Sequence, residues 1–363
     1  MMSDGRTLLL LAAVCVVLAG LAGWRWQLRR RYPPYRQSRQ YGRRTFANTP
    51  PAAALHRRST LAALLCMALY PQRYRPPQPL PVQRPDWDAF FCADDKERIK
   101  MIWFGHSSLL MRVGGKTVFF DPVFAPSVSP LPWMMRRFQA APAALHELPP
   151  VDYVVYSHNH YDHLDKTAFQ HFAATATQFI VPLGMAALLR SWGAASERIR
   201  EADWWDEIAL DGWQLHAVPA RHNSGRGWGD TNLTLWNGWV VRTQSESIYY
   251  SGDSSYGSHF AEIGKRFGGL DLALIENGQY NPAWRDNHMF PEQTVQAALD
   301  VRAKCLMPVH WGAYALSTHP WDEPVCRSIP LARHEGLAVL TPVQGQVFDR
   351  ESETFRWWEN GES

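Results

Sequence analysis

The sequence has few cysteines, and none of them forms a metal-binding or disulfide pattern. Only five occur in 363 residues, and no two form a CxxC pair. Disulfide-stabilised domains and thiolate zinc sites depend on paired cysteines at characteristic spacings. The sequence therefore indicates neither, and it favours a reducing compartment. The five are Cys15, Cys66, Cys92, Cys305 and Cys326.

The chain also lacks solenoid repeats, low-complexity tracts and a large net charge, which is only +3. With 46% hydrophobic and 20% charged residues it is predicted to be globular, neither disordered nor fibrous. A length of 363 residues predicts one sizeable core with an appendage. The 17 tryptophans suit a core, an interface or a lipid-facing rim, and composition does not choose among these.

One long apolar run lies near the N-terminus. Residues 7–24 contain no charged side chain, and as a helix rising 1.5 Å per residue they would extend about 27 Å, close to the thickness of a bilayer core. A cleaved signal peptide is the alternative, but only Arg6 precedes the run, opposed by Asp4, whereas many arginines follow it. This charge bias predicts a single uncleaved pass through a bacterial inner membrane, with the rest of the chain in the cytoplasm.

Residues 25–95 are predicted to be a basic, proline-rich linker. Their arginine cluster directly follows the apolar run, so it suits anionic lipid headgroups better than nucleic acid, and we expect no nucleic-acid partner. Residues 59–70 are apolar but too short to span a bilayer, which predicts an interfacial helix or one packed on the next domain. Residues 76–85 are typical of a semi-rigid spacer. The cluster consists of Arg25, Arg29, Arg30, Arg31, Arg36, Arg39, Arg43 and Arg44.

Short β-branched and aromatic runs, punctuated by Gly, Pro and Asp, begin near residue 99 and predict strands. Helical stretches lie among them, so we expect two β-rich halves covered by helices, in an α/β domain at residues 96–350 with a tail at residues 351–363. The runs expected as strands are MIWF, SLLMRV, KTVFFD, DYVVYS, WQLHAV, LTLWN, SIYYSGD, LALIEN and CLMPVH. The expected helices are residues 165–175, 185–192, 260–267 and 291–304.

A cluster of metal-binding residue types follows one of these runs. The strand at residues 152–157 ends directly in a loop with four such side chains in six positions. In an extended loop, side chains two positions apart face the same way, so the first two histidines can share one metal while the last two members reach a second. A polar loop with incidental histidines is the alternative, and the density of ligands argues against it. The four residues are His158, His160, Asp162 and His163.

Three isolated candidates recur later, each at the exit of an apolar run: His222, Asp253 and His310. Taken singly, each would be an ordinary hydrogen-bonded side chain. Strand ends that converge on one sheet edge can, however, bring distant ligands together, because rigid strands fix the positions and loops leave room for substrate. Together with the histidine loop, these residues predict one shared site.

The HxHxDH segment followed by these three residues resembles the metallo-β-lactamase superfamily over roughly residues 98–350. The resemblance implies an α/β fold, a four-layer αβ/βα sandwich, here preceded by the predicted transmembrane helix. It also implies two divalent metal ions with Asp253 bridging them. Since the ligands are His and Asp without thiolate, zinc is the default, with iron or manganese as alternatives. The implied ligands are His158, His160 and His222 for one ion and Asp162, His163 and His310 for the other.

Longer stretches resemble the N-acylphosphatidylethanolamine-hydrolysing phospholipase D group. This resemblance implies a phosphodiesterase that acts on a phospholipid, with a water between the two metals supplying hydroxide to attack phosphorus. The chain departs from the group's pattern at residues 276–280 and at Phe290, where a polar helix cap would be expected. A lactonase or other ester hydrolase therefore remains an alternative, whereas a non-catalytic membrane scaffold is disfavoured because all seven ligand positions are filled. The matching stretches are WFGH at residues 103–106, DPVF at 121–124, SHNHYDHLD at 157–165, DWW at 203–205, EIGKRFG at 262–268 and HWGAYAL at 310–316.

Further residues are predicted to assist the reaction. His288 matches a histidine thought to line the substrate site of that group, and it and Asp253 are the candidate proton donors; Asp162 is the third residue expected to act in catalysis. We expect Asp121 to orient the histidine loop by hydrogen bonds and not to bind metal. A loop at residues 125–138 could seat a lipid or pack on the N-terminal helical segment. The other candidates near ligands or substrate are His106, His319 and, in this loop, Trp133, Arg136 and Arg137.

Overall fold

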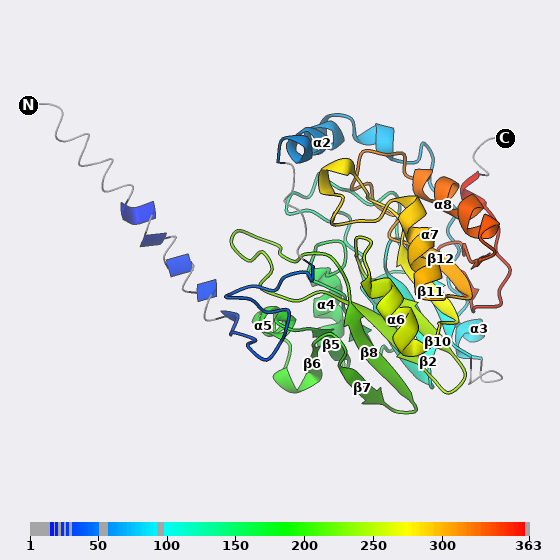
Figure 1. Ribbon diagram of the computed structural model, residues 1–363, viewed down its shortest axis with the longest axis horizontal. Helices are drawn as coiled ribbons and strands as arrows, with labels where there is room; N and C mark the ends of the chain where they lie inside the picture. The colour runs from blue at the N-terminus through cyan, green and yellow to red at the C-terminus, as the bar shows by residue number, and fades with distance from the viewer. Residues whose placement is uncertain are drawn as a thin grey trace, which may run out of the picture.

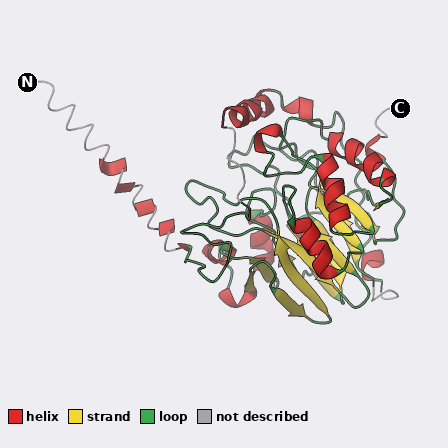
Figure 2. Cartoon of the chain, in the orientation of Figure 1, coloured by secondary structure: helices red, strands yellow, loops and turns green. Residues whose placement is uncertain are grey.

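Two seven-stranded β-sheets form the centre of the computed structural model (Figures 1 and 2). It describes residues 15–17, 19–20, 23–24, 27–28, 31–50, 57–92 and 98–359. The first sheet, in the order β14-β1-β2-β3-β4-β5-β6, contains β1 (Lys100–Trp103), β2 (Leu109–Val113), β3 (Lys116–Phe120), β4 (Tyr153–Val155), β5 (Gln178–Pro182), β6 (Ile199–Ala202) and β14 (Val347–Phe348). The second sheet, in the order β13-β12-β11-β10-β9-β8-β7, contains β7 (Glu207–Leu210), β8 (Trp213–Pro219), β9 (Asn237–Arg242), β10 (Ser247–Tyr250), β11 (Leu272–Glu276), β12 (Cys305–Val309) and β13 (Ala338–Val339).

The central strands of both sheets are buried on both faces. Successive side chains of a strand point to opposite faces, so in β11 Leu274 enters the core between the two sheets while Ala273 and Ile275 enter the core under the helices. β4 divides in the same way, with Val155 between the sheets and Val154 beneath helices. The apolar runs of the sequence are therefore continuous because neither face of these strands meets water.

Helices cover the outer face of each sheet. α4 and α5 pack on the first sheet, and α6, α7 and α8 contribute to the core on the second. The order of helices, sheet, sheet and helices agrees with the α/β sandwich that the resemblance implied. The helices are α2 (Arg57–Leu69), α3 (Trp87–Phe91), α4 (Lys166–Ala173), α5 (Met185–Ser191), α6 (His259–Phe267), α7 (Pro291–Asp300) and α8 (Glu323–His334), with 3-10 turns η1 (Pro71–Tyr74), η3 (Leu145–Glu147), η4 (Ser196–Arg198), η5 (Pro282–Trp284) and η6 (Trp357–Glu359).

The parallel strand pairs place several loops at one edge. β3 runs parallel to β4 in the first sheet, and β10, β11 and β12 run parallel to one another in the second. Their carboxyl ends consequently open on the same side of each sheet. The residues that follow these strands, including Asp121 and His310, are thereby brought towards one region.

The strand and helix predictions hold for most runs, with one clear error. LTLWN, at residues 233–237, is loop up to Trp236, and the strand β9 begins only at Asn237. Leu235 and Trp236 are nonetheless buried, because they pack with Tyr35 and Phe46 of the N-terminal segment. Their apolar character reflects this contact and not a strand. The elements that we did not predict include β5, β6, β7, β9 and α8.

Segments expected as linker and tail join the catalytic body. Among residues 31–50, Tyr35 and Phe46 are buried against the 235–236 turn. At the other end, Trp357 lies in the core between the sheets, and its ring stacks on Trp311 with centroids 5.0 Å apart. The described parts of both terminal segments therefore contribute to the folded body.

The predicted membrane span, residues 7–24, falls largely outside the described residues. Within the part of the chain that the structure describes, no helix is both long enough and apolar enough to cross a bilayer. The short apolar run at residues 59–70 does form a helix, α2, which packs on η5 through Ala63.

A prediction concerns Gly264, where α6 crosses the end of α7. A Cβ atom at this position would lie 2.2 Å from the carbonyl oxygen of Asp300, so the two helices would have to move apart. We expect Gly264→Ala to lower the free energy of unfolding by about 1–3 kcal/mol, the usual cost of overpacking, as measured by urea denaturation. Gly42→Ala, whose new Cβ would meet Thr45 at an ordinary 3.5 Å, is the control; equal stability of the two variants would contradict the packing argument.

Candidate metal centre

The predicted ligands meet at the carboxyl ends of strands from both sheets. The loop after β4 carries His158, His160, Asp162 and His163 from the first sheet. The second sheet supplies a residue after each of β8, β10 and β12, and all of these side chains are buried or nearly so. Among the described residues three candidate metal-binding groups result, and within each the ligand atoms lie within 4.8 Å of one another; the first two below contain all of the predicted ligands, and the third combines Asp253 and His310 with Glu276 and His288. The residues from the second sheet are His222, Asp253 and His310.

The first group contains three histidines and one carboxylate. Nδ1 of His160 lies 2.9 Å from Nε2 of His158 and 3.2 Å from Nε2 of His222. Oδ2 of Asp253 lies 3.7 Å and 3.6 Å from the same two Nε2 atoms. Donor atoms bound to one ion at about 2.0–2.2 Å would lie roughly 3–3.6 Å apart, so these spacings suit a single divalent cation.

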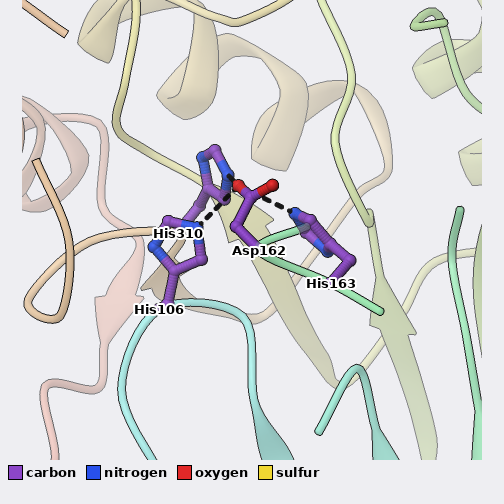
Figure 3. A group of neighbouring side chains, drawn as sticks. All are labelled: His106, Asp162, His163 and His310. Atoms are coloured by element: carbon purple, nitrogen blue, oxygen red, sulfur yellow. Dashed lines mark hydrogen bonds and ion pairs between the residues drawn. The ribbon is translucent and has the colours of Figure 1, made fainter. Parts of the chain in front are cut away.

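The second group surrounds Asp162. Figure 3 shows the carboxylate of Asp162 among the rings of His106, His163 and His310. Oδ2 of Asp162 lies 3.6 Å from Nε2 of His163 and 3.3 Å from Nε2 of His310. Nε2 of His106 approaches the same oxygen at 3.0 Å. This group also has the spacing of a cation site.

Asp253 belongs to both sets of contacts. While its Oδ2 faces His158 and His222, its Oδ1 lies 3.0 Å from Nε2 of His163 and 3.2 Å from Nε2 of His310. One carboxylate thus directs one oxygen to each histidine set. This is the geometry expected of a residue that bridges two ions.

The electrostatics of the site reflect this crowding. Burial works against charge on His163, but Asp253, Asp162 and Asp121 raise its pKa to about 10. Burial lowers the pKa of His160 to about 4. Although burial tends to raise the pKa of Asp253, the neighbouring His163 and His310 hold it well below its usual range. The carboxylate of Asp253 is therefore charged at neutral pH and favours cations beside it.

The donor atoms also fit a metal by their hydrogen bonding. Nε2 of His163 and Oδ1 of Asp253 are buried, lie close together and make no hydrogen bond. In His222 and His158 the ring nitrogen opposite Nε2 has a polar partner. Nδ1 of His222 contacts the carbonyl oxygen of Asn287 at 3.0 Å, and Nδ1 of His158 contacts Ser157 at 3.0 Å. A ring nitrogen that donates outward leaves its partner free to bind an ion. The residues present thus suit two divalent metals.

Asp121, which the sequence predicts to orient the histidine loop, contacts that loop and β10. Its carboxylate accepts hydrogen bonds from the backbone N–H of Ser157 at 2.7 Å and from the hydroxyl of Tyr250 at 2.6 Å. It also contacts Nδ1 of His163 at 2.6 Å, on the side of the ring away from Asp253. Asp121 therefore orients a ligand without occupying a ligand position.

Glu276 was not predicted as a site residue. It is fully buried at the end of β11, and its Oε2 lies 2.8 Å from Nδ1 of His288 and 3.4 Å from Nδ1 of His310. Its Oε1 accepts from the backbone N–H of Met289 at 2.6 Å. The ring of His288 stacks on His310, with centroids 5.0 Å apart, so the structure brings His288 to the centre. The signal for Glu276 was available, because an acidic residue that closes the apolar run LALIE follows the same strand-exit pattern.

Two other candidates lie further from the ligand atoms. His319 stacks on Tyr280, with ring centroids 4.3 Å apart. Arg137 is buried, and its guanidinium donates to the carbonyl oxygens of Val123 and Phe104 and to the hydroxyl of Tyr314. It is thus used to hold the backbone, whereas Arg136 is exposed.

Two residues with no sequence signal support the ligand loops. The side chain of Asn48 donates to the carbonyl oxygen of His222 at 2.8 Å and accepts from its N–H at 3.1 Å. Nη1 of Arg226 donates to the carbonyl oxygens of His160 and Leu164 at 3.1 and 2.7 Å, and its guanidinium lies 3.8 Å from the ring centre of Tyr161. The loop after β4 and the segment after β8 that carries His222 are therefore fixed through their backbone.

The helix after this site begins without the expected polar cap. Phe290 precedes α7, and its N–H donates to Oε1 of Gln293 at 3.0 Å. The side chain three positions into the helix thus reaches back to satisfy the backbone, as in a capping box. An apolar residue at this position is compatible with a stable helix start.

Asp121→Asn tests the orienting role of this carboxylate. The amide would turn a donor towards groups that donate to Asp121, among them Tyr250 and the N–H of Ser157. We expect metal affinity to fall roughly 10–100-fold, measured by competition with a chromophoric chelator. The control is Asp211→Asn, since the Asp211 side chain is 82% exposed. Unchanged affinity in Asp121→Asn would exclude the orienting role.

Asn48→Ala tests whether the N-terminal segment supports His222. The variant leaves the buried backbone groups of His222 without their partner, at a cost of about 1–3 kcal/mol in the free energy of unfolding, and we expect faster loss of metal to chelator. Gln37→Ala, at an exposed position of the same segment, should change neither stability nor metal loss. If both variants behave like the parent chain, His222 is held by its own strand alone.

Comparison with known proteins agrees with this architecture. The chain is 38% identical over 331 residues to an uncharacterized protein of Mycobacterium tuberculosis, covering 89% of this chain and 88% of that protein. It is 33% identical to the N-acyl-phosphatidylethanolamine-hydrolyzing phospholipase D 1 of Caenorhabditis elegans, over 60% of this chain and 64% of that enzyme. The isothiocyanate hydrolase from gut bacteria of Delia radicum shares the fold, with a TM-score of 0.57 and 22% identity over 69% of this chain and 98% of that one.

Residues 116–311 match the family model described as a β-lactamase superfamily domain. This match spans more than half of the chain and includes each of the seven predicted metal ligands. It also includes the strand exits that place them. The chain therefore belongs to the β-lactamase superfamily and has the fold of its metal-dependent hydrolases.

Proposed function

We propose that this chain is a membrane-anchored, two-metal phosphodiesterase that hydrolyses a phospholipid of the N-acylphosphatidylethanolamine type. The observation that carries the proposal is Asp253, whose two oxygens face separate histidine sets. The likeness to the C. elegans phospholipase supports the substrate class. We further propose zinc as the metal, residues 7–24 as the anchor and the cytoplasm as the location of the catalytic domain.

In the proposed site, Asp162, Asp253 and the five histidines would hold the metals. Two divalent ions, when bound, acidify a water towards neutral pH and offset negative charge on the reacting phosphate. Asp253 would fix the positions of the two ligand sets relative to each other. Asp121, by its contact with Nδ1 of His163, keeps Nε2 of that ring directed at the centre. The protein's contribution is thus a rigid, largely water-free arrangement of charge.

Hydrolysis must also supply a proton to the leaving alcohol. The oxygen of water forms the new bond to phosphorus, the bond from phosphorus to the leaving oxygen breaks, and that oxygen takes up one proton. We propose His288 as the residue that delivers it, since its Nδ1 contacts Glu276 at 2.8 Å while its ring lies against His222 and His310. Asp162 and Asp253 would remain ligands in this scheme, and His106 would steady Asp162 by its contact at 3.0 Å.

A lactone or another carboxylic ester is the alternative substrate. The same metals and ligands would polarise an acyl carbonyl as well as a phosphate, and the isothiocyanate hydrolase shows that the fold serves other reactions. Residues 276–280 lie next to the centre and depart from the phospholipase pattern. This departure is the feature of this chain that favours the alternative substrate.

Asp253→Asn tests the two-metal proposal. Loss of the charged bridge should remove at least one metal ion per chain. It should also remove several kcal/mol of transition-state stabilisation, which corresponds to a decrease of about 10³-fold in kcat/KM. Bound metal would be measured by elemental analysis, and activity on N-acylphosphatidylethanolamine, a generic phosphodiester and a lactone panel. Chelation of the parent chain should abolish activity on every substrate that it hydrolyses.

The substrate panel separates the two candidate functions. Asp211→Asn, at an exposed position, should retain full activity and metal. Robust lactone opening without phosphodiester hydrolysis would replace the phospholipid substrate by an ester. Activity that survives both chelation and Asp253→Asn would exclude the two-metal mechanism itself.

A further inference from the structure

Helix α2 exposes most of its apolar surface. Among the side chains of α2 that the structure describes, residues 59–69, only Ala63 and Met67 are buried. A helix on the surface of a soluble protein ordinarily turns its apolar stripe towards the core, but here three leucines that recur every fourth residue, and hence share one face, point outward. They are Leu61, Leu65 and Leu69, with exposed fractions of 60%, 51% and 69%, and we call them the leucine stripe.

The loop at residues 125–138 extends this apolar surface. Leu131 and Trp133 are 43% and 68% exposed. Between α2 and this loop lies a pocket of about 690 Å³, lined by Leu64 and Met67 on one side and by Trp133 and Met134 on the other. The pocket places this loop beside α2, which is one of the two arrangements expected for the loop from the sequence.

The two chain segments that carry the leucine stripe and Trp133 are basic in sequence and contain no acid. Residues 57–85 and 122–146 include no Asp or Glu. Arg73 and Arg136 are exposed, and Arg75 donates to the carbonyl oxygen of Arg136 at 2.5 Å, which ties the loop to the end of η1. Any partner of this surface must accept apolar side chains and uncompensated positive charge together.

We propose that the leucine stripe and Trp133 lie in the interface of an anionic lipid bilayer. The thirteen residues of α2 would extend only about 20 Å at 1.5 Å per residue, too short to span, so the helix would lie in the plane of the interface. Anionic headgroups match the arginines, and a tryptophan suits the boundary between acyl chains and water. A second copy of the chain fits less well, because a symmetric contact would oppose arginines to arginines.

This surface connects directly to the metal centre. Ala63 of α2 packs on Trp284 of η5, whose indole N–H donates to the carbonyl oxygen of Gln279 at 2.8 Å. The side chain of Gln279 in turn donates to the carbonyl oxygen of His310 at 3.2 Å. Bilayer contact at α2 would therefore hold the centre close to the lipid surface. The inference depends on the composition of this surface and not on the substrate, so it stands apart from the proposed phosphodiesterase activity.

The exposed Cys66 on α2 provides the probe. In the full chain, Cys15→Ser, Cys92→Ser and Cys326→Ser leave Cys66 as the only exposed cysteine among the described residues, since Cys305 is buried. An environment-sensitive dye on Cys66 should shift its emission to the blue and lose quenching by iodide when vesicles containing phosphatidylglycerol are added. Phosphatidylcholine vesicles should give a clearly smaller change. Because the dye reports on α2 itself, attachment through residues 7–24 does not produce the signal.

Two further chains complete the test. The control carries the dye at Asp211→Cys with Cys66→Ser added; this position lies in the turn between β7 and β8, far from α2 in Figure 1, and its dye should remain quenchable. Leu61→Gln, Leu65→Gln and Leu69→Gln together, with folding checked by circular dichroism, should abolish the shift at Cys66. Full quenching of the Cys66 dye on anionic vesicles would overturn the proposal. So would equal shifts on both vesicle types, or a shift that grows with protein concentration without vesicles, which would indicate a second copy.

Discussion

The carboxylate of Asp253 is the group around which the two halves of the protein meet. A buried carboxylate costs free energy unless opposite charges or hydrogen-bond donors surround it. Its neighbours come from the loop after β4 in one sheet and from the ends of β8 and β12 in the other. The core between the sheets must therefore pack in one relative position to satisfy this residue. The same contacts therefore have two consequences in this chain. They arrange the side chains so that two cations can bind, and they fix how the two sheets pack on each other.

Backbone conformation shows what this arrangement costs. Asp121, His106 and His310 have φ angles of 41°, 53° and 69°, a region that residues with side chains rarely adopt. Each such position costs roughly 1–3 kcal/mol and persists only where its surroundings determine it. Here the N–H of His310 donates to the carbonyl oxygen of His106 at 2.9 Å, and Asp121 is held by Ser157, Tyr250 and His163. At these three positions the unfavourable backbone geometry is offset by contacts within the site.

The sequence revealed the parts of the site that are local or that repeat a pattern. The loop from His158 to His163 is visible because its ligands are adjacent, and Asp253 because it follows an apolar run. The same rule applies to Glu276, which closes the apolar run LALIE but begins the stretch that departs from the phospholipase pattern. Asn48 could not be found, because it contacts a residue 174 positions away and nothing in its neighbourhood marks that contact. Similarly, LTLWN is apolar because it packs against Phe46. In the sequence, an apolar run that arises from such a tertiary contact has the same pattern as a strand.

The difference between local sequence patterns and tertiary contacts also explains why the sequence identifies the family but not the substrate. The family is recognised from residues suited to binding metals, and such residues serve a phosphate and an acyl carbonyl alike. Discrimination must come from loops around the centre, chiefly residues 125–138 and 277–290. The second of these carries His288 and η5, and it supports α2, whose leucines are exposed. A change in this loop can alter both what enters the site and how the site meets a bilayer, while Asp121 and Glu276 keep the ligands in place.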